Sequence, residues 1–434
     1  MTLRNASMFL VMAALLVLVG WLQSWSVAMG LLNMCLISAI MALGVNIQWG
    51  YAGLFSVGTM GFVALGGLAV VLTSMPPVHD AWAAGGPGVL AAMAIGVGAI
   101  VAAVQVYKRM AKGWARAAAL TLVIVAGFMA YRAVLDPSVA AIEGTNTAVA
   151  GYLGGAGMPV LLSWLVGGLL AAGAAWVIGK VSLGLRSDYL AIATLGIAET
   201  IVAVLKNEDW LSRGVRNVNG LPRPYPVPYE VSLQSSPEFV AWAQSLGFDA
   251  VAASSLVVKG SYALIFVVVL AIIMWLSERA WTSPWGRMMR AIRDNETAAR
   301  AMGKDVTRRH LQVFILGSAV CGIAGAMLVT LDGLMTPGSY QPLRFTFLIW
   351  VMVIVGGSGN NWGSVLGGFL IWFLWVEVEP IGLWLIGALT STMAEDSALR
   401  AHLIDAAAHM RLMTMGVLLL LVLRFAPRGL IPEK

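Results

Sequence analysis

Residues 285–309 read WGRMMRAIRDNETAARAMGKDVTRR, a long polar run between two strongly apolar segments. The run carries seven cations, which are Arg287, Arg290, Arg293, Arg300, Lys304, Arg308 and Arg309. Its carboxylates are Asp294, Glu296 and Asp305. Because charged residues make up 11% of the whole chain, this run is a concentration of charge in an apolar protein. We interpret it as a loop that meets the aqueous phase and a partner there.

The composition of the remaining chain indicates an integral membrane protein. Of its 434 residues 59% are hydrophobic, far above the value of soluble domains. The 48 glycines favour closely packed helices, and the alternating segments of roughly ten residues that mark a membrane barrel are absent. The net charge of +6 is spread over separate loops. It therefore indicates orientation in a lipid membrane rather than binding to nucleic acid.

We predict an all-α, polytopic helical bundle that forms one transmembrane domain, residues 1–434. Spans of roughly 20 residues would number eight to twelve. Basic connectors at 108–116 and 180–186 and the tail at 424–434 mark the cytoplasmic side. Twelve crossings would also place both termini there. The first apolar run, 8–22, is expected to be an uncleaved helix; the alternative is a signal peptide removed after Ser26-Val27-Ala28.

Two glycine-rich interruptions divide apolar runs, one in each half of the chain. They are QWGYAGLFSVG at 48–58 and GGSGNNWGSVLGG at 356–368. Irregular backbone at membrane depth is tolerated where it is buried in protein or lines a water-filled cavity, and broken helices mark the sites of many transporters. We predict broken or re-entrant elements that line a translocation pathway, although the first could be an ordinary loop. The pathway residues expected here are Tyr51, Ser56, Gly356, Gly357, Gly359 and Asn360.

The apolar span at 187–206 contains Thr194 and Glu199. A carboxylate at membrane depth is costly, so Glu199 is expected to face the bundle interior or a cavity. Both residues are added to the predicted pathway. The alternative is that Glu199 reaches the aqueous border. After this span, residues 207–260 form the longest polar stretch, which we predict to be a folded outer loop.

The sequence contains no G-x-x-x-x-G-K-[ST] loop for ATP, and no H-E-x-x-H or G-x-S-x-G motif. Its two cysteines, Cys35 and Cys321, lie in separate apolar runs, and its four histidines show no metal-ligand spacing. We expect no catalytic residue, no metal site and no cofactor in this chain. A pathway driven by a separate engine, rather than an enzyme, fits this composition.

The charged run also resembles a known family. The sequence GRMMRAIRDNETAARAMGKDVT at 286–307 is similar to the loop of the M-type permease subunits of branched-chain amino acid ABC transporters. Four further stretches, GYAGLFSVG (50–58), SDYLAIATLGIAE (187–199), GGSGNNWGSVLGG (356–368) and APRGLIP (426–432), match this family in the same order. Five collinear matches cover both halves of the chain.

The resemblance implies one subunit of a bacterial inner-membrane importer. Its partners would be a second homologous permease, two cytoplasmic ATPase subunits that bind ATP, and a periplasmic substrate-binding protein. The implied activity is passage of branched-chain or related amino acids by alternating access. A urea or short-amide ABC permease is the alternative, and a stand-alone secondary carrier is another. The implied ATPase-coupling residues are Arg287, Arg290, Arg293, Asp294, Glu296, Ala298, Ala299 and Gly303.

Residues 285–309 should accordingly form a cytoplasmic coupling loop. We predict a single amphipathic helix from Arg287 to Met302, because Arg290, Arg293 and Glu296 recur at helical spacing. Gly303 would end it. The chain departs from the family at 108–157, which looks like an insertion, and at 213–221, which lacks the usual T-G-G-x-x-G-L. These departures leave the coupling loop intact.

Overall fold

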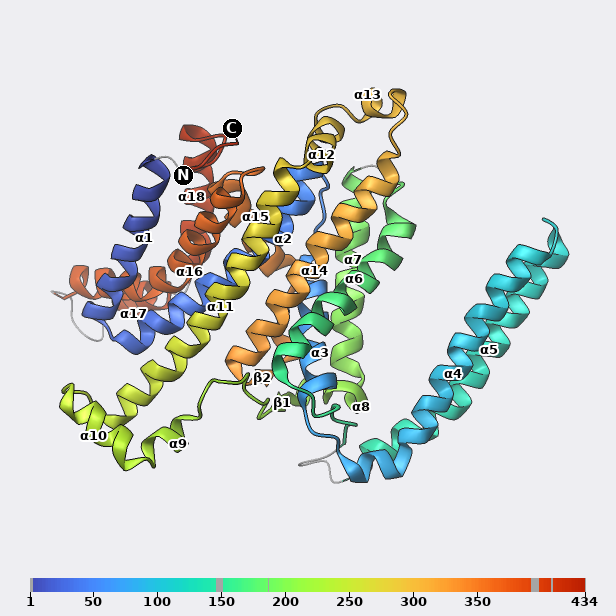
Figure 1. The fold of residues 1–434 in the computed structure, drawn as a ribbon, viewed down its shortest axis with the longest axis horizontal. Coiled ribbons are helices and arrows are strands. Elements are labelled where there is room, and N and C mark those ends of the chain that lie inside the picture. The colour runs from blue at the N-terminus through green and yellow to red at the C-terminus, as the bar shows by residue number, and fades with distance from the viewer. Residues whose placement is uncertain (1–2, 146–150, 186, 392–397, 407–408, 434) are drawn as a thin grey trace.

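The computed structural model describes residues 3–145, 151–185, 187–391, 398–406 and 409–433. Most of this part is helical (Figure 1). Nine of its helices are long and apolar enough to cross a membrane, which confirms the predicted polytopic helical bundle. They are α1 (Leu3–Leu22), α2 (Trp25–Ala52), α4 (His79–Arg109), α5 (Trp114–Glu143), α6 (Val160–Ser182), α7 (Ser187–Asn207), α11 (Ala250–Thr282), α14 (Val306–Asp332) and α16 (Asn361–Leu389).

Shorter elements complete the described chain. The apolar ones are α3 (Thr59–Ser74), α15 (Pro342–Gly356) and α18 (Met410–Phe425). The other helices and strands are α8 (Asp209–Ser212), η1 (Gly214–Arg216), β1 (Val218–Asn219), α9 (Glu230–Gln234), α10 (Pro237–Ser245), α12 (Pro284–Asp294), α13 (Glu296–Ala301), β2 (Leu334–Met335), η2 (Pro337–Ser339) and α17 (Ala398–Ala406). With 16 and 15 residues, α3 and α15 are shorter than the roughly 20 residues of a full span.

The centre of the bundle is built on α2 and α14, which pack against each other and are surrounded by α3, α6, α11, α15 and α16. Helix α2 is buried almost continuously from Cys35 to Ala52, as expected of a helix that is apolar on every side. Small residues allow the close approach. Gly44 of α2 lies against Gly317 and Cys321 of α14, where a larger side chain would collide with backbone.

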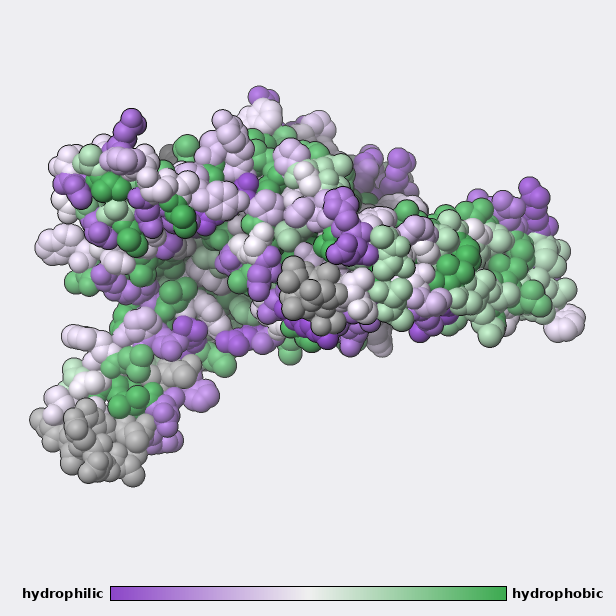
Figure 2. Space-filling model, turned by 90° about the horizontal axis from the view of Figure 1, so that it is seen from below, coloured by the Kyte–Doolittle hydropathy of each residue, from purple (hydrophilic) through white to green (hydrophobic). Residues whose placement is uncertain are grey.

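Helices α4 and α5 form a hairpin that projects from the bundle, here called the arm (Figure 1). Its two helices pack mainly against each other, and apolar side chains such as Leu122 are exposed, as expected of a surface that faces lipid. In Figure 2 the arm is largely hydrophobic, with hydrophilic residues toward its far end. The predicted insertion at 108–157 includes α5, whereas the arm itself begins at His79.

One end of the bundle carries β1, β2 and helices α8 to α10, and the opposite end carries α12 and α13 (Figure 1). Strands β1 and β2 pair antiparallel, with Val218 opposite Met335. Within the predicted outer loop at 207–260, helix α11 begins at Ala250. The Asp249 side chain accepts a hydrogen bond from the Val251 amide (3.2 Å) and so caps that helix.

Candidate functional site: the coupling loop and the junction beneath it

The charged run at 285–309 folds into two short helices, so the prediction of a single helix from Arg287 to Met302 is wrong. Helix α12 is amphipathic and buries Met289 and Ile292 against the bundle. The chain then becomes extended at Asn295, with φ −155° and ψ 94°. The Asn295 side chain accepts a hydrogen bond from the Ala298 amide (2.9 Å). Asparagine therefore ends one helix and caps the next, which is its favoured local role.

Helix α13 ends at Ala301, and Gly303 terminates it, as the sequence predicted for the end of the loop helix. The Gly303 amide donates to the Arg300 carbonyl (2.9 Å), and the Lys304 amide donates to the Ala299 carbonyl (3.1 Å). This pair of bonds defines a Schellman end, which needs a residue with positive φ. Gly303 supplies it, with φ +76°.

The predicted coupling residues divide into an outward and an inward group. Arg287, Asp294, Glu296, Ala298 and Gly303 are exposed, and Glu296 forms an ion pair with Arg300 across one turn of α13. Ala299 is buried at the base of the loop, and Arg290 lies over the Trp281 ring at 4.6 Å. The outward group forms the surface available to a partner. The inward group attaches the loop to the bundle.

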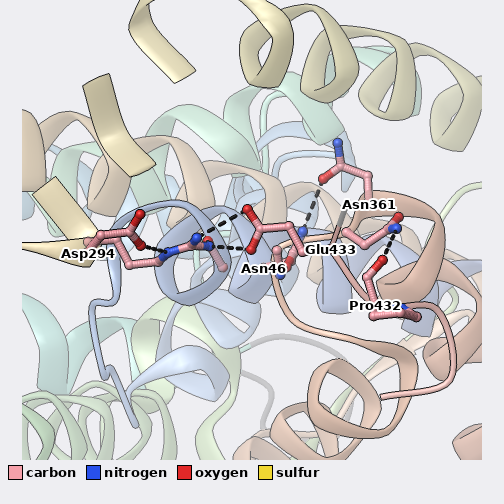
Figure 3. Close-up of polar contacts among 9 residues, drawn as sticks. Asn46, Asp294, Asn361, Pro432 and Glu433 are labelled. Atoms are coloured by element: carbon pink, nitrogen blue, oxygen red, sulfur yellow. Dashed lines mark hydrogen bonds and ion pairs between the residues drawn. The ribbon is translucent and has the colours of Figure 1, made fainter. Parts of the chain in front are cut away.

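Arg293 points into the protein, contrary to the expectation that it faces a partner beside Arg290 and Glu296. Its guanidinium donates to the Gly50 carbonyl and forms an ion pair with Glu433 of the C-terminal tail (2.9 Å) (Figure 3). It also contacts Asp294 (3.3 Å). Partial burial disfavours the charged form. The hydrogen bond and charge of Glu433 outweigh this effect, so the pKa of Arg293 lies above its usual value.

Next to Arg293, a buried hydrogen-bonded cluster joins the two glycine-rich interruptions. The Asn361 side-chain oxygen accepts from the Asn46 amide (3.0 Å) and from the Tyr51 hydroxyl (2.9 Å). The Asn46 oxygen accepts from the Gly359 backbone amide (2.9 Å). Asn361 in turn donates to Glu278 of α11 (3.2 Å). We call Asn46, Tyr51, Asn361 and Glu278 the junction.

The sequence prediction included Tyr51 and missed the other members of the junction. Asn46 and Asn361 are 0% and 2% exposed. Buried amides need partners, because an unpaired polar group costs free energy. Two signals in the sequence could have identified both residues. Asn46 is an asparagine within an apolar run, and Asn361 belongs to an Asn-Asn pair in a glycine-rich stretch.

The second interruption, Gly357–Asn360, is held by the C-terminal tail. The Ile431 amide donates to the Gly356 carbonyl (2.9 Å), and the Asn360 side chain donates to the Pro432 carbonyl (3.0 Å) (Figure 3). Gly357 and Gly359 have φ of +119° and +80°. The predicted pathway residues Gly356, Gly357, Gly359 and Asn360 thus lie at the end of the bundle beneath the coupling loop.

The first interruption, residues 53–58, lies between α7 and α15. The Val57 amide donates to the Thr194 hydroxyl (3.0 Å), and the Trp350 indole donates to the Ser56 carbonyl (3.0 Å). Thr194 therefore contacts the same segment that contains Ser56. The Ser56 hydroxyl is buried without a hydrogen-bond partner among the described residues.

Glu199 is exposed on the surface of α7 and does not face the interior of this chain. It lines an open groove of about 980 Å³ together with residues of α15 and α18. The structure therefore separates Glu199 from Tyr51, Gly359 and Asn360, which belong to the junction region. Thr194 and Ala198 lie one helical turn apart on the buried face of α7. The next residue, Glu199, is therefore turned away from that face.

Fold and site together define a polytopic helical membrane protein in which an exposed charged loop is attached to two interrupted helices. Residues 115–423 match the family model described as branched-chain amino acid transport system / permease component. The chain belongs to this family.

Among similar proteins is the high-affinity branched-chain amino acid transport system permease protein LivM of Escherichia coli (strain K12), 28% identical over 212 residues, or 48% of each chain. The probable branched-chain amino acid transport permease protein LivM of Methanocaldococcus jannaschii is 26% identical over 61% of this chain and 67% of its own. The chain thus spans about half the length of the Escherichia coli relative. No solved structure matches it.

Proposed function

We propose that this chain is the permease subunit of an ATP-driven importer and forms part of a pathway for branched-chain or related amino acids. The description of the matched family and the names of the similar proteins support the substrate class. Two separate cytoplasmic ATPase subunits would bind the ATP, and a second homologous permease would complete the pathway. A periplasmic substrate-binding protein would deliver the amino acid.

The observation that carries this proposal is the position of Arg293. It lies in the coupling loop, yet its guanidinium contacts the Gly50 carbonyl and Glu433. Glu433 directly follows Ile431 and Pro432, the tail residues that contact Gly356 and Asn360. A displacement of the loop would therefore reach both interrupted helices at once. Packed, hydrogen-bonded elements transmit such displacements because they do not deform continuously. Alternating access driven from the loop is the mechanism that this connection supports.

The same proposal assigns an orientation in the inner membrane. The loop with α12 and α13, the start of α1 and the described C-terminal end lie at one end of the bundle (Figure 1). The loop is rich in arginine, and the tail carries Arg424 and Arg428. Because Lys and Arg accumulate on the cytoplasmic side, both termini and the coupling loop would be cytoplasmic.

Uptake of labelled leucine, isoleucine and valine by cells with and without the intact gene tests the proposal. Loss of uptake on deletion, restored by this chain only when the ATPase can hydrolyse ATP, is the expected result. The purified chain reconstituted alone into liposomes serves as the second arm. Substrate flux through these liposomes without any ATPase would overturn the proposal in favour of a stand-alone carrier.

A further inference from the structure

The groove that contains Glu199 is built from three apolar helices. Helix α15 contacts both α7 and α18, and the groove of about 980 Å³ is lined by residues of all three. Arg344 lies near the start of α15 and Arg411 near the start of α18. Glu199 lies within α7, away from both ends of the helix.

Three charged groups in this groove have no ion-pair partner in the described part of the chain. They are the Glu199 carboxylate, the Lys206 ammonium group and the Arg344 guanidinium, whereas Arg411 is paired with Glu379. Arg344 is positioned by the Trp375 ring, at 5.1 Å, and by the Phe345 ring, at 5.6 Å. Stacking on aromatic rings orients an arginine while its N–H groups stay available.

Unpaired charges on the surface of membrane helices are costly against hydrocarbon, and they mark substrate pathways when they face a water-filled cavity. Glu199 is a carboxylate on the surface of an apolar helix, and it lines the open groove. A ligand with one positive and one negative group would satisfy both Glu199 and Arg344.

Behind the groove lies an apolar space of about 180 Å³, here called the methionine cavity. It is lined by Met34, Met41, Met60 and Met352, with further residues of α2, α3, α14, α15 and α16. Methionine side chains adapt to ligands of different shape. A water molecule takes about 30 Å³ in the liquid, so this space could hold about six groups of that size. It is therefore large enough for a branched side chain of four carbons.

Groove and methionine cavity adjoin, because Tyr340 and Leu348 line both. The cavity is also lined by Trp372, whose buried indole N–H has no hydrogen-bond partner among the described residues. Native proteins pair most buried donors, so this N–H is available to a polar group that enters the cavity.

We infer that the groove and the methionine cavity form one binding site for a zwitterionic α-amino acid with an aliphatic side chain. The Arg344 guanidinium binds the α-carboxylate, the Glu199 carboxylate binds the α-ammonium group, and the side chain enters past Tyr340 and Leu348. This inference rests on the proposed function and adds the residues that recognise the substrate.

The test uses the purified complex of this chain with its co-purifying partners, in nanodiscs and without the binding protein. Saturation-transfer NMR would measure the binding of leucine, of 4-methylpentanoate, which lacks the ammonium group, and of isoamylamine, which lacks the carboxylate. We expect Arg344→Gln to weaken leucine and 4-methylpentanoate at least tenfold and to spare isoamylamine. Glu199→Gln should weaken leucine and isoamylamine to the same extent and spare 4-methylpentanoate.

Arg116→Gln is the matched control. Arg116 also stacks on an aromatic ring, that of Tyr107 at 4.8 Å, but it lies on the arm. It should leave the binding of all three compounds unchanged. A misfolded variant would lose all three compounds together, so the opposite selectivity of the two groove variants separates recognition from folding.

A second pair of variants tests the methionine cavity. Met352→Ala should shift the preference between leucine and phenylalanine toward phenylalanine by about tenfold, and Ser38→Leu should shift it between leucine and alanine toward alanine. Ser38 lines the same cavity. These ratios do not depend on the fraction of protein that is folded.

The outcomes distinguish the two proposals. Uptake of leucine by wild-type cells, with binding that neither Arg344→Gln nor Glu199→Gln alters, would overturn the site and leave the proposed function standing. The Glu199→Gln complex could instead lose the second permease without a change in ligand preference. This result would show that the groove is a subunit interface, and it would also overturn the proposed binding site. Neither uptake nor binding of any aliphatic amino acid by the wild type would overturn both.

Discussion

Arg293 and Asn361 show how single side chains connect distant parts of this chain. Arg293 joins the coupling loop to residues 243 and 140 positions away, Gly50 and Glu433. Asn361 uses both its oxygen and its amide nitrogen inside the bundle. Each residue is polar in buried surroundings, so its loss leaves partners unpaired. Substitutions of these two residues should therefore lower the free energy of unfolding more than substitutions of surface residues.

Arg293→Ala should lower uptake at least tenfold while the ATPase still co-purifies with the chain. The loop would keep its outward surface but lose its contacts with Gly50 and Glu433. The free energy of unfolding should fall by about 1–2 kcal/mol, because Glu433 is left without its partner. Arg308→Ala, which removes an exposed arginine near the same loop, is the control for charge. Normal uptake by Arg293→Ala would contradict the transmission assigned to this residue.

Asn361→Ala should destabilise the protein by about 1–3 kcal/mol, because the Asn46 amide loses its acceptor in the interior and Glu278 loses a donor, while the Tyr51 hydroxyl keeps the Ser277 carbonyl. Denaturant unfolding in detergent measures this change. Asn207→Ala removes an exposed asparagine that bonds only to its own helix (2.8 Å) and should cost less than about 0.5 kcal/mol. Equal losses in the two variants would show that the junction has no special energetic role.

The two helices of the coupling loop, α12 and α13, differ in what they contact. Helix α12 packs on the bundle through Met289 and Ile292, and α13 presents Glu296 and Ala298 outward. The break at Asn295 changes the direction of the chain between them. Predictions about partner binding therefore belong to α13.

Glu296→Lys should abolish association with the ATPase while membrane insertion stays unchanged. The substitution replaces the ion pair with Arg300 by two cations one turn apart and reverses the charge at the start of α13. Co-purification measures association. Lys304→Glu reverses a charge on the same loop but outside α13. It shows whether ATPase association depends on the position of the charge or on the net charge of the loop. An ATPase that co-purifies normally with Glu296→Lys would exclude α13 as its docking element.

Gly303→Ala should weaken ATPase association without affecting the bundle. A Cβ at Gly303 meets open space, so the cost comes from its positive φ and amounts to about 1–2 kcal/mol. Gly157→Ala introduces the same strain at φ +66°, also in open space, in the connection between α5 and α6. Association should stay normal in this control. Equal weakening in both variants would indicate general destabilisation rather than a distorted end of α13.

At the scale of the whole molecule, the bundle has two chemically different ends. One carries the coupling loop and the basic tail, and the other carries the β1–β2 pair and helices α8 to α10 (Figure 1). The arm extends from the second end back toward the level of the first, and its tip carries Lys108, Arg109, Lys112 and Arg116. This distribution of lysine and arginine agrees with a single orientation in the membrane.

Cysteine labelling tests this orientation. Cys35 and Cys321 are both fully buried, so the native background should be low. A membrane-impermeant thiol reagent added outside spheroplasts should label Gln244→Cys of α10. It should reach Lys112→Cys and Lys304→Cys only after the membrane is opened. Labelling of Lys304→Cys in intact spheroplasts would reverse the topology.

The amino-acid sequence by itself determined the class of the protein, most of its spans, the charged loop and both glycine-rich interruptions. These features depend on local properties, since about 20 apolar residues make a span and neighbouring arginines mark a cytoplasmic loop. Tertiary structure alone decided that Asn46 meets Asn361, 315 residues later, that Arg293 turns inward, and that Glu199 lies on an outer groove. Hydropathy is a sum over neighbours in sequence, whereas these contacts depend on how helices far apart in the chain rotate and pack against one another.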